Sequence, residues 1–244
     1  MKTLIIIPSR LAATRLPGKP LLKINGLSII SHVFKKAEKA KIGEVLVATE
    51  NQEILDDVKK NGGQAVLTSN KHNTGTDRIY EALQKIKTSN IDLIMNLQGD
   101  EPLIDVNDIR NLNQQMINNN SQIGTLALRI LDKKIYDRYS VVKVKTKKKL
   151  NQKNFPEAVN FERKTKKKDL NVYQHVGIYC YELRALQDYV SYKQSVNETR
   201  YKLEQLRALE NKIKINVALA KSYSLGIDTK EDFMAIKNIM EYKT

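Results

Sequence analysis

The sequence is poor in the features that mark secreted and membrane proteins. It has a single cysteine, Cys180, so no disulfide can form within the chain, which fits a reducing cytoplasm. No apolar run approaches the length of a membrane span. The apolar stretch before Pro8 holds only four residues, too few for the core of a signal peptide. We therefore expect a cytoplasmic protein with no membrane segment.

The sequence also lacks the signs of a modular or repetitive protein. It has no internal repeat and no stretch rich enough in glycine, proline or serine to separate independent domains. With 244 residues, of which 41% are apolar and 28% charged, the chain can bury a sizeable core beneath a charged surface. We predict a single domain, residues 1–244, whose halves 1–122 and 123–244 differ in pattern.

The formal net charge of +15 raises the question of a nucleic-acid partner. Much of the excess lies in two lysine-rich runs, residues 143–153 and 164–168. Neither run contains the aromatic side chains that stack on bases. We therefore expect no nucleic-acid partner and interpret the runs as solvated loops. Attraction of an acidic substrate or a nucleotide is a second interpretation.

Apolar runs and amphipathic stretches alternate along the first half. We predict strands at residues 4–7, 44–49, 65–67 and 93–97, and helices at 28–40, 52–60, 76–87 and 105–118. Regular alternation is typical of parallel strands joined by right-handed crossovers. The fold class is therefore α/β, with a doubly wound, mainly parallel, Rossmann-like sheet.

The rhythm changes from residue 123. We predict strands at 124–130, 141–145, 158–161 and 173–181, with no long helix between the first three. This pattern indicates an inserted, antiparallel β region that packs on the same sheet. The remaining predicted elements are helices at 183–190, 198–209 and 230–240 and a strand at 214–218.

Three polar loops follow predicted strands of the first half, at residues 10–19, 73–76 and 98–102. Ligands of such sheets bind beyond the carboxyl ends of the strands, so the three loops should share one rim. The first loop carries Arg10, Arg15 and Lys19, which suit phosphate oxygens. A surface loop with solvated charges is the alternative, and composition alone favours it.

The other two loops also have competing interpretations. Residues 73–76 offer hydroxyls and backbone amides to a base or phosphate, but ordinary helix capping is commoner. Asp100 follows a buried strand and is placed to hold a divalent metal, although Gly99 and Pro102 also favour a turn. Asp228 either caps the last helix or supplies a second carboxylate, if the last strand returns beside the fourth.

Two further sites carry weaker signals. His175 lies in an apolar strand, where a lone histidine is more often structural than catalytic. Glu204 and Gln205 adjoin the apolar positions of a predicted helix, and on this pattern alone they face solvent.

Taken together, five motifs resemble the 3-deoxy-D-manno-octulosonate cytidylyltransferase (CMP-Kdo synthetase) family. They occur in order and at compatible spacing over nearly the whole chain. They are Arg10 with Thr14-Arg15-Leu16-Pro17-Gly18-Lys19-Pro20, Asn96-Leu97-Gln98-Gly99-Asp100-Glu101-Pro102, His175-Val176-Gly177-Ile178-Tyr179, Leu203-Glu204-Gln205-Leu206-Arg207 and Gly226-Ile227-Asp228-Thr229. The first is shared by many sugar nucleotidyltransferases, whereas the second and fourth point to this family.

The resemblance implies transfer of CMP from CTP to the acidic sugar Kdo, with release of pyrophosphate, for lipopolysaccharide assembly. It implies a nucleotidyltransferase sheet in a homodimer, with a nucleotide-binding half, 1–122, and a sugar-binding and dimerisation half, 123–244. Mg²⁺ would bind Asp100 and Asp228, which with Lys19 form the catalytic set. The implied CTP ligands are Arg10, Arg15, Lys19, Asn73, Thr74, Gly75, Thr76 and Arg78. The implied Kdo ligands are Gln98, Arg163, His175, Tyr179, Glu204 and Gln205.

One segment departs from the family pattern. Glu162 stands where the family usually has serine, and the lysine-rich run 164–168 replaces an Ile-Pro step. Whether Arg163 meets the sugar carboxylate therefore stays open, as does the choice between Kdo and its 8-amino analogue. Tyr179, Tyr181 and their strand are candidates for the dimer interface.

Overall fold

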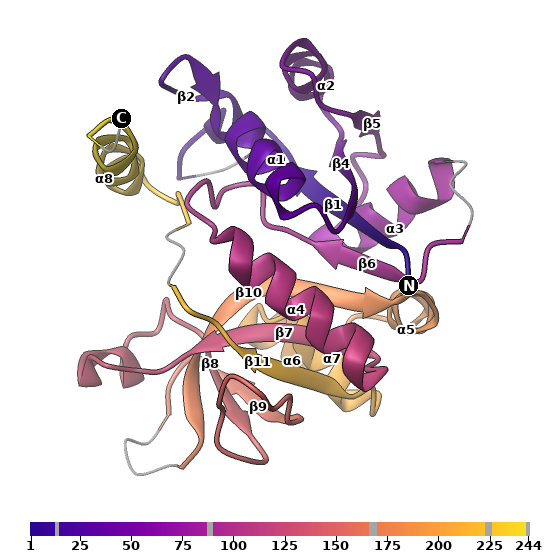
Figure 1. The fold of residues 1–244 in the computed structure, drawn as a ribbon, viewed down its shortest axis with the longest axis vertical. Coiled ribbons are helices and arrows are strands. Elements are labelled where there is room, and N and C mark those ends of the chain that lie inside the picture. The colour runs from indigo at the N-terminus through magenta and orange to yellow at the C-terminus, as the bar shows by residue number, and fades with distance from the viewer. Residues whose placement is uncertain (13–14, 87–89, 166–169, 223–225, 243–244) are drawn as a thin grey trace.

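The computed structural model describes residues 1–12, 15–86, 90–165, 170–222 and 226–242 (Figure 1). The strands are β1 Thr3–Ser9, β2 Lys23–Ile24, β3 Leu27–Ser28, β4 Gly43–Thr49, β5 Ala65–Leu67, β6 Leu93–Asn96, β7 Ile123–Leu128, β8 Lys143–Thr146, β9 Ala158–Glu162, β10 Val172–Glu182 and β11 Ile215–Leu219. The α-helices are α1 Ile29–Ala40, α2 Gln52–Lys60, α3 Gly75–Lys85, α4 Val106–Asn119, α5 Leu183–Ser191, α6 Val196–Tyr201, α7 Gln205–Glu210 and α8 Lys230–Glu241. Short 3₁₀ helices cover Lys19–Leu21 and Lys133–Tyr136.

One sheet runs through both halves of the chain, with its main strands in the order β11-β7-β10-β6-β1-β4-β5. β1 pairs in parallel with β4 and β6, and β4 pairs in parallel with β5. β10 runs antiparallel to both β6 and β7, and β11 is parallel to β7. The predicted α/β, mainly parallel, doubly wound fold is confirmed.

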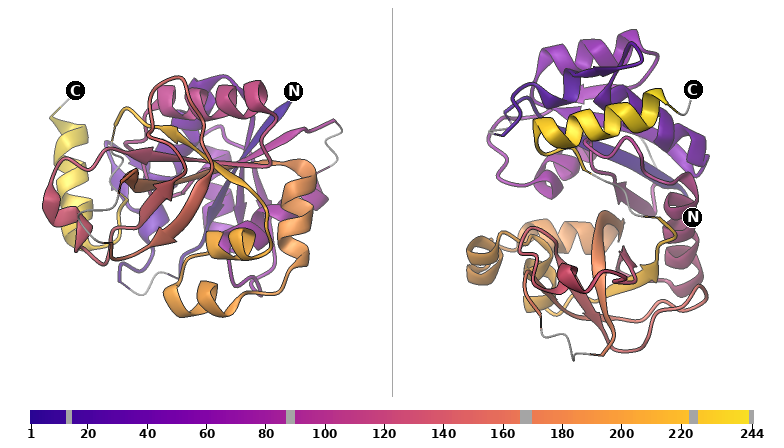
Figure 2. Two further views of the ribbon diagram at one scale, coloured as in Figure 1. Left: turned by 90° about the horizontal axis from the view of Figure 1, so that it is seen from below. Right: turned by 90° about the vertical axis from the view of Figure 1, so that its left-hand side faces the viewer.

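The strand β1 shows why helices cover both faces of the sheet. Leu4 and Ile6 contribute to one hydrophobic cluster, with α3, α5 and α7, while Ile5 and Ile7 contribute to another, with α1, α2 and α4. Successive side chains of a strand point to opposite faces, so a strand covered on both sides is apolar throughout. Figures 1 and 2 show the helices on either side of the sheet.

The inserted β region has the predicted antiparallel pairing. β8 pairs with β9 and with residues 172–174 at the start of β10. The interpretation of residues 143–153 as solvated is wrong for Lys143, which is 0% exposed. Residues 166–168 of the second lysine-rich run lie outside the described residues.

Two predicted helices end differently in the structure. The helix expected at 198–209 is split into α6 and α7, because Lys202 adopts a left-handed conformation with φ 53° and ends α6. The helix expected at 76–87 ends at Lys85, and residue 87 lies outside the described residues. The β2–β3 hairpin was not predicted, although Asn25-Gly26 is a favoured hairpin turn and both residues have positive φ.

The C-terminal helix α8 returns to the N-terminal half of the molecule (Figure 2). Ile236 of α8 and Ile227 pack with Ile24 and Ile29 in a small separate hydrophobic cluster. The segment just before α8 is thereby brought next to the cationic loop. No helix in the described ranges is long and apolar enough to cross a membrane.

Candidate active site

A cleft of about 600 Å³ opens at the carboxyl ends of the parallel strands. It is lined by residues from both halves of the chain, and every site residue named in the sequence analysis is among them. These are Arg10, Arg15, Lys19, Asn73, Thr74, Gly75, Thr76, Arg78, Gln98, Asp100, Arg163, His175, Tyr179, Glu204, Gln205 and Asp228. The expected common rim of the three loops therefore exists, whereas the role of each residue stays a prediction.

Lys19 forms the centre of the charged end of the cleft. Gly18, with φ 69°, turns the loop into the 3₁₀ helix, and Pro20 stiffens its start. The Lys19 ammonium is 2.6 Å from Asp100 Oδ2 and 3.5 Å from Asp228 Oδ1. Arg15 approaches Asp228 Oδ2 at 3.1 Å. Two carboxylates are thus brought to one cation, beside a loop that carries further positive charge.

Asp228 reaches this position by a route that the sequence did not indicate. β6 lies between β10 and β1, whereas β11, the last strand, lies at the edge of the sheet beyond β7. The condition that we attached to Asp228 is therefore wrong, yet its side chain arrives beside Asp100. The Ile227 amide donates to the Asp100 carbonyl at 3.0 Å, and Asp232 accepts from the Asp228 amide at 3.1 Å.

The pair Asp100 and Asp228 fits a magnesium ion that shares its coordination with phosphate. Mg²⁺ is commonly held by one or two carboxylates together with substrate phosphates and water. Both carboxylates lie within 3.5 Å of one cationic atom, the Lys19 Nζ, so a single cation can contact both. Within the described ranges, no group of three or more histidine, cysteine or acidic side chains could form a self-sufficient metal cage.

The loop at residues 73–76 combines capping with access to the cleft. Thr74 is the N-cap of α3, where its hydroxyl accepts from the Asp77 amide at 3.2 Å and donates to Asp77 Oδ2 at 2.8 Å. Arg78 is 3% exposed, pairs with Glu50 and donates to Thr68 Oγ1 at 2.7 Å. Its guanidinium therefore holds the segment that precedes the loop.

His175 of β10 also lines the cleft. Its Nε2 is 3.0 Å from both Thr125 Oγ1 and the Tyr179 hydroxyl, and its ring meets Phe161 edge-on at 5.2 Å. Burial lowers the pKa of His175 to about 3, so the imidazole is neutral near pH 7. A neutral ring in this setting can orient a hydroxyl but carries no positive charge for a phosphate.

A bulge in β10 shapes the part of the cleft next to His175. The pairing register with β7 shifts between Val176 and Tyr179, and bulges of this kind re-aim the neighbouring side chains. Gln98, which follows β6, donates from Nε2 to the Gly177 carbonyl at 3.1 Å. The bulge therefore joins the Gln98 loop to the His175 strand. Tyr179 and Tyr181 are 9% and 4% exposed inside this sheet, so their expected place in a dimer interface is wrong.

The expectation that Glu204 and Gln205 face solvent is also wrong. Gln205 is 8% exposed, and Glu204 Oε2 accepts from the Thr76 hydroxyl at 2.9 Å. Burial raises the pKa of Glu204 above its ordinary value. Arg163 donates to the carbonyls of Tyr201 at 2.8 Å and Lys202 at 3.0 Å, and so holds the segment that precedes this pair.

Asn96 and His72 also line the cleft, although the sequence analysis assigned neither of them a role. Asn96 is 3% exposed at the end of β6, and its Oδ1 has no hydrogen-bond partner among the described residues. An asparagine within the otherwise apolar run 93–97 was the signal that could have identified it. His72 lines the cleft and pairs with Glu81 of α3. Thr14, part of the first motif, lies outside the described residues.

A doubly wound sheet with a cationic loop and two carboxylates at its carboxyl rim defines an α/β nucleotidyltransferase. A family model described as cytidylyltransferase matches residues 4–215. The chain is 43% identical to the 3-deoxy-manno-octulosonate cytidylyltransferase of Thermodesulfovibrio yellowstonii over 95% of each chain. It is 42% identical to that of Afipia carboxidovorans over 98% of this chain and 96% of the relative. The chain belongs to the 3-deoxy-manno-octulosonate cytidylyltransferase family and is a nucleotidyltransferase.

Solved structures agree with this placement. The CMP:2-keto-3-deoxy-manno-octonic acid synthetase complexed with CTP superimposes with a TM-score of 0.89 at 33% identity, over 100% of both chains. A cytidylyltransferase from Leptospira borgpetersenii shares the fold, with a TM-score of 0.65 at 23% identity over 99% of this chain and 87% of that one.

Proposed function

We propose that this enzyme transfers CMP from CTP to the anomeric hydroxyl of Kdo, giving CMP-Kdo and pyrophosphate for lipopolysaccharide biosynthesis. The observation that carries the proposal is the meeting of Lys19, Asp100 and Asp228 in one cleft whose lining also includes the polar side chains His175 and Glu204. The names of the relatives favour Kdo over its 8-amino analogue.

The reaction joins the sugar oxygen to the α-phosphorus and breaks the bond between that phosphorus and the bridging oxygen of pyrophosphate. The hydroxyl proton leaves to solvent, and pyrophosphate carries away the electron pair. Transfers of this type depend on in-line positioning and charge neutralisation rather than on a protein nucleophile. The cationic side chains Arg10, Arg15 and Lys19 would bind and orient the triphosphate.

We propose Asp100 and Asp228 as the protein ligands of Mg²⁺. When bound, the metal would neutralise phosphate charge and make the attacking hydroxyl more acidic. The Lys19 ammonium contacts both carboxylates, at 2.6 and 3.5 Å, and so reduces their mutual repulsion. The same ammonium would also contact a phosphate oxygen of the nucleotide.

Neutral polar groups of the cleft lining would recognise the sugar. His175 and Tyr179 form one hydrogen-bonded pair at 3.0 Å, and Gln98 is held by the Gly177 carbonyl. Neutral donors and acceptors suit hydroxyl groups, because an unpaired buried polar group penalises a ligand that lacks the matching partner. Arg163 would meet the sugar carboxylate if it exchanged its carbonyl partners.

We further propose that the enzyme acts in the cytoplasm as a homodimer. Cys180 is buried as a free thiol, which suits a reducing compartment. Large apolar side chains of the inserted region are exposed, among them Leu131 at 90%, Tyr139 at 56% and Val159 at 51%. A second copy could cover them, and light scattering during size-exclusion chromatography would distinguish a dimer from a monomer.

The proposed function is tested by pyrophosphate release with CTP and Mg²⁺ against Kdo, 8-amino-Kdo and sialic acid. We expect release with Kdo and none when either CTP or the sugar is omitted. Release with 8-amino-Kdo alone would redirect the proposal to that sugar, and no release with any member of the panel would refute it.

A further inference from the structure

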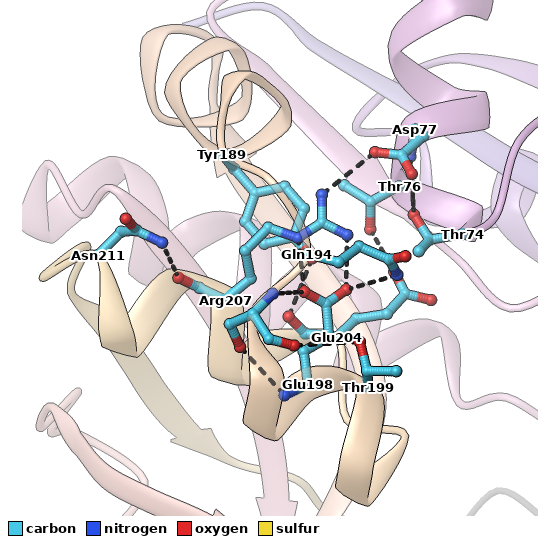
Figure 3. A network of polar contacts seen from close by, with 11 residues as sticks. Thr74, Thr76, Asp77, Tyr189, Gln194, Glu198, Thr199, Glu204, Arg207 and Asn211 are labelled. Carbon is cyan, nitrogen blue, oxygen red and sulfur yellow. Dashed lines mark hydrogen bonds and ion pairs between the residues drawn. The ribbon is translucent and has the colours of Figure 1, made fainter.

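Two polar contacts connect the nucleotide loop with the segment that carries Glu204 (Figure 3). The Thr76 hydroxyl donates to Glu204 Oε2 at 2.9 Å. Arg207 Nη1 donates to Asp77 Oδ1 at 3.4 Å, between residues 130 positions apart in the sequence. Both contacts run from the first turn of α3 to the α6–α7 segment, so the two sides of the cleft are joined by side chains as well as by the sheet.

In the contact between Arg207 and Asp77, the Arg207 side chain is held rigidly by its other partners. Its side chain is 2% exposed, and Nε and Nη2 donate to Glu198 at 2.8 and 2.6 Å. The guanidinium also lies 4.5 Å from the centre of the Tyr189 ring, within the range of a cation–π contact. With two nitrogens and one face engaged, Arg207 has little freedom to move toward Asp77.

In the same contact, Asp77 is the residue whose side chain can move when a ligand binds. Its carboxylate is 26% exposed, and it shares a reciprocal pair of hydrogen bonds with Thr74. Thr74 belongs to the loop that we propose for CTP. A nucleotide that orders residues 73–76 would therefore also fix the carboxylate that faces Arg207.

The α6–α7 segment that carries Arg207 also carries Glu204 and Gln205, the pair proposed to bind the sugar. Glu204 is the N-cap of α7 and Gln205 is its first residue, and the same short helix contains Arg207. The Glu204 carbonyl accepts from the Tyr189 hydroxyl at 2.9 Å, so the start of α7 is held against α5. The position of Glu204 relative to the nucleotide loop is thus set by contacts at Thr76 and Asp77.

We propose that Asp77 and Arg207 are positioning residues that align the Glu204–Gln205 pair with the nucleotide loop and couple the binding of CTP to the binding of the sugar. Neither residue needs to touch a reacting atom for this role. The inference rests on the proposed function, because it assigns residues 73–76 to the nucleotide and Glu204 to the sugar. By thermodynamic linkage, each substrate would raise the affinity for the other by the same factor.

The test is calorimetric titration of Kdo into the full-length protein with Mg²⁺, alone and with a CTP analogue whose α,β bridging oxygen is replaced by methylene. For the unaltered protein we expect the analogue to raise Kdo affinity by about fivefold or more, the lower end of usual coupling. Asp77→Asn keeps an oxygen that can accept from Thr74 but loses its charge toward Arg207. In this variant we expect the factor to fall below about twofold, with affinity for the analogue nearly unchanged.

Two matched comparisons separate positioning from general damage. Thr76→Val should lower the coupling factor, whereas Thr76→Ser, which keeps the hydroxyl, should restore it. Asp105→Asn changes the N-cap aspartate of α4 and should leave the coupling factor unchanged, since Asp105 does not line the cleft. Steady-state kinetics should show the same split, with the KM for Kdo raised in Asp77→Asn and the KM for CTP conserved.

The outcomes distinguish the inference from the proposed function. If the unaltered protein binds no Kdo under either condition, the proposed function fails. If it binds both ligands without coupling, or if Asp77→Asn retains full coupling, the positioning role is refuted while the proposed function stands. A parallel loss of affinity for both ligands in Asp77→Asn would also contradict the inference, because it would indicate a structural role alone.

Discussion

The buried ion pair between Arg207 and Glu198 provides the sharpest prediction about stability. Both side chains are at most 3% exposed, and two guanidinium nitrogens face the two carboxylate oxygens. Arg207→Met would leave the Glu198 carboxylate buried with only neutral donors, the Ser195 amide at 3.1 Å and the Gln194 amide at 3.2 Å. Removing one member of a buried pair costs about 3–5 kcal/mol, so we expect the free energy of unfolding to fall by that amount.

Urea denaturation at pH 7 measures this effect, with two further variants for comparison. Glu198→Gln combined with Arg207→Met removes both charges of this pair, so it should be clearly more stable than Arg207→Met alone. Lys147→Met breaks an ion pair to Glu157 whose lysine is 59% exposed, and it should cost about 1 kcal/mol or less. A cost below about 1 kcal/mol for Arg207→Met, or a double variant as unstable as the sum of its parts, would refute the reasoning.

The same ion pair determines whether the free energy of unfolding rises or falls with pH. Burial by itself would raise the pKa of Glu198, but hydrogen bonds from Arg207, Gln194 and Ser195 hold it below its ordinary value. A carboxyl group whose pKa is lowered in the folded state binds protons more readily when unfolded. Its stabilising contribution is therefore complete above the unfolded pKa and is lost as the pH falls through the folded pKa. The penalty of Arg207→Met should shrink in acid accordingly.

Two further predictions concern single titratable side chains. His175, with a pKa of about 3, should show no titration of its ring protons by NMR between pH 5 and 8, and it should reduce stability as the pH falls below the unfolded value of 6.5; a midpoint near 6.5 in the folded protein would contradict this. Lys143→Met removes an ammonium that donates to the carbonyls of Arg138, Val141 and Arg163. Thermal denaturation should therefore show a lower Tm, and the KM for Kdo should rise. An unchanged KM would show that Lys143 does not support the sugar site.

The regular part of the fold could be predicted from local patterns. The run Leu4–Ile7 is apolar at every position, and α1 and α4 place their apolar residues on one face, so period and length alone identified these elements. The end of α6 could not be predicted, because nothing in the sequence marks Lys202 for a left-handed conformation. Such a backbone is imposed by tertiary contacts, here the hydrogen bonds from Arg163 to the Lys202 and Tyr201 carbonyls.

The candidate site also combines residues that could be predicted from the sequence with residues that could not. Arg10, Lys19 and Asp100 lie in loops directly after strands of the parallel sheet, so their convergence follows from topology. Asp228 joins them only because the small cluster around Ile227 docks α8 on the N-terminal half, a long-range contact with no local signature. The burial of Glu204 likewise depends on a partner, Thr76, that lies 128 positions away in the sequence.

The central claim is that this cleft joins CMP to Kdo, and the product itself tests it most directly. Phosphorus NMR of the enzyme with CTP, Kdo and Mg²⁺ should show the triphosphate signals replaced by one phosphodiester signal and pyrophosphate in equal amounts. The same mixture with Asp100→Asn, at an unfolding free energy within about 1 kcal/mol of the unaltered protein, should retain its CTP. Intact CTP with the unaltered enzyme, or release of inorganic phosphate and CDP in place of pyrophosphate, would contradict the claim.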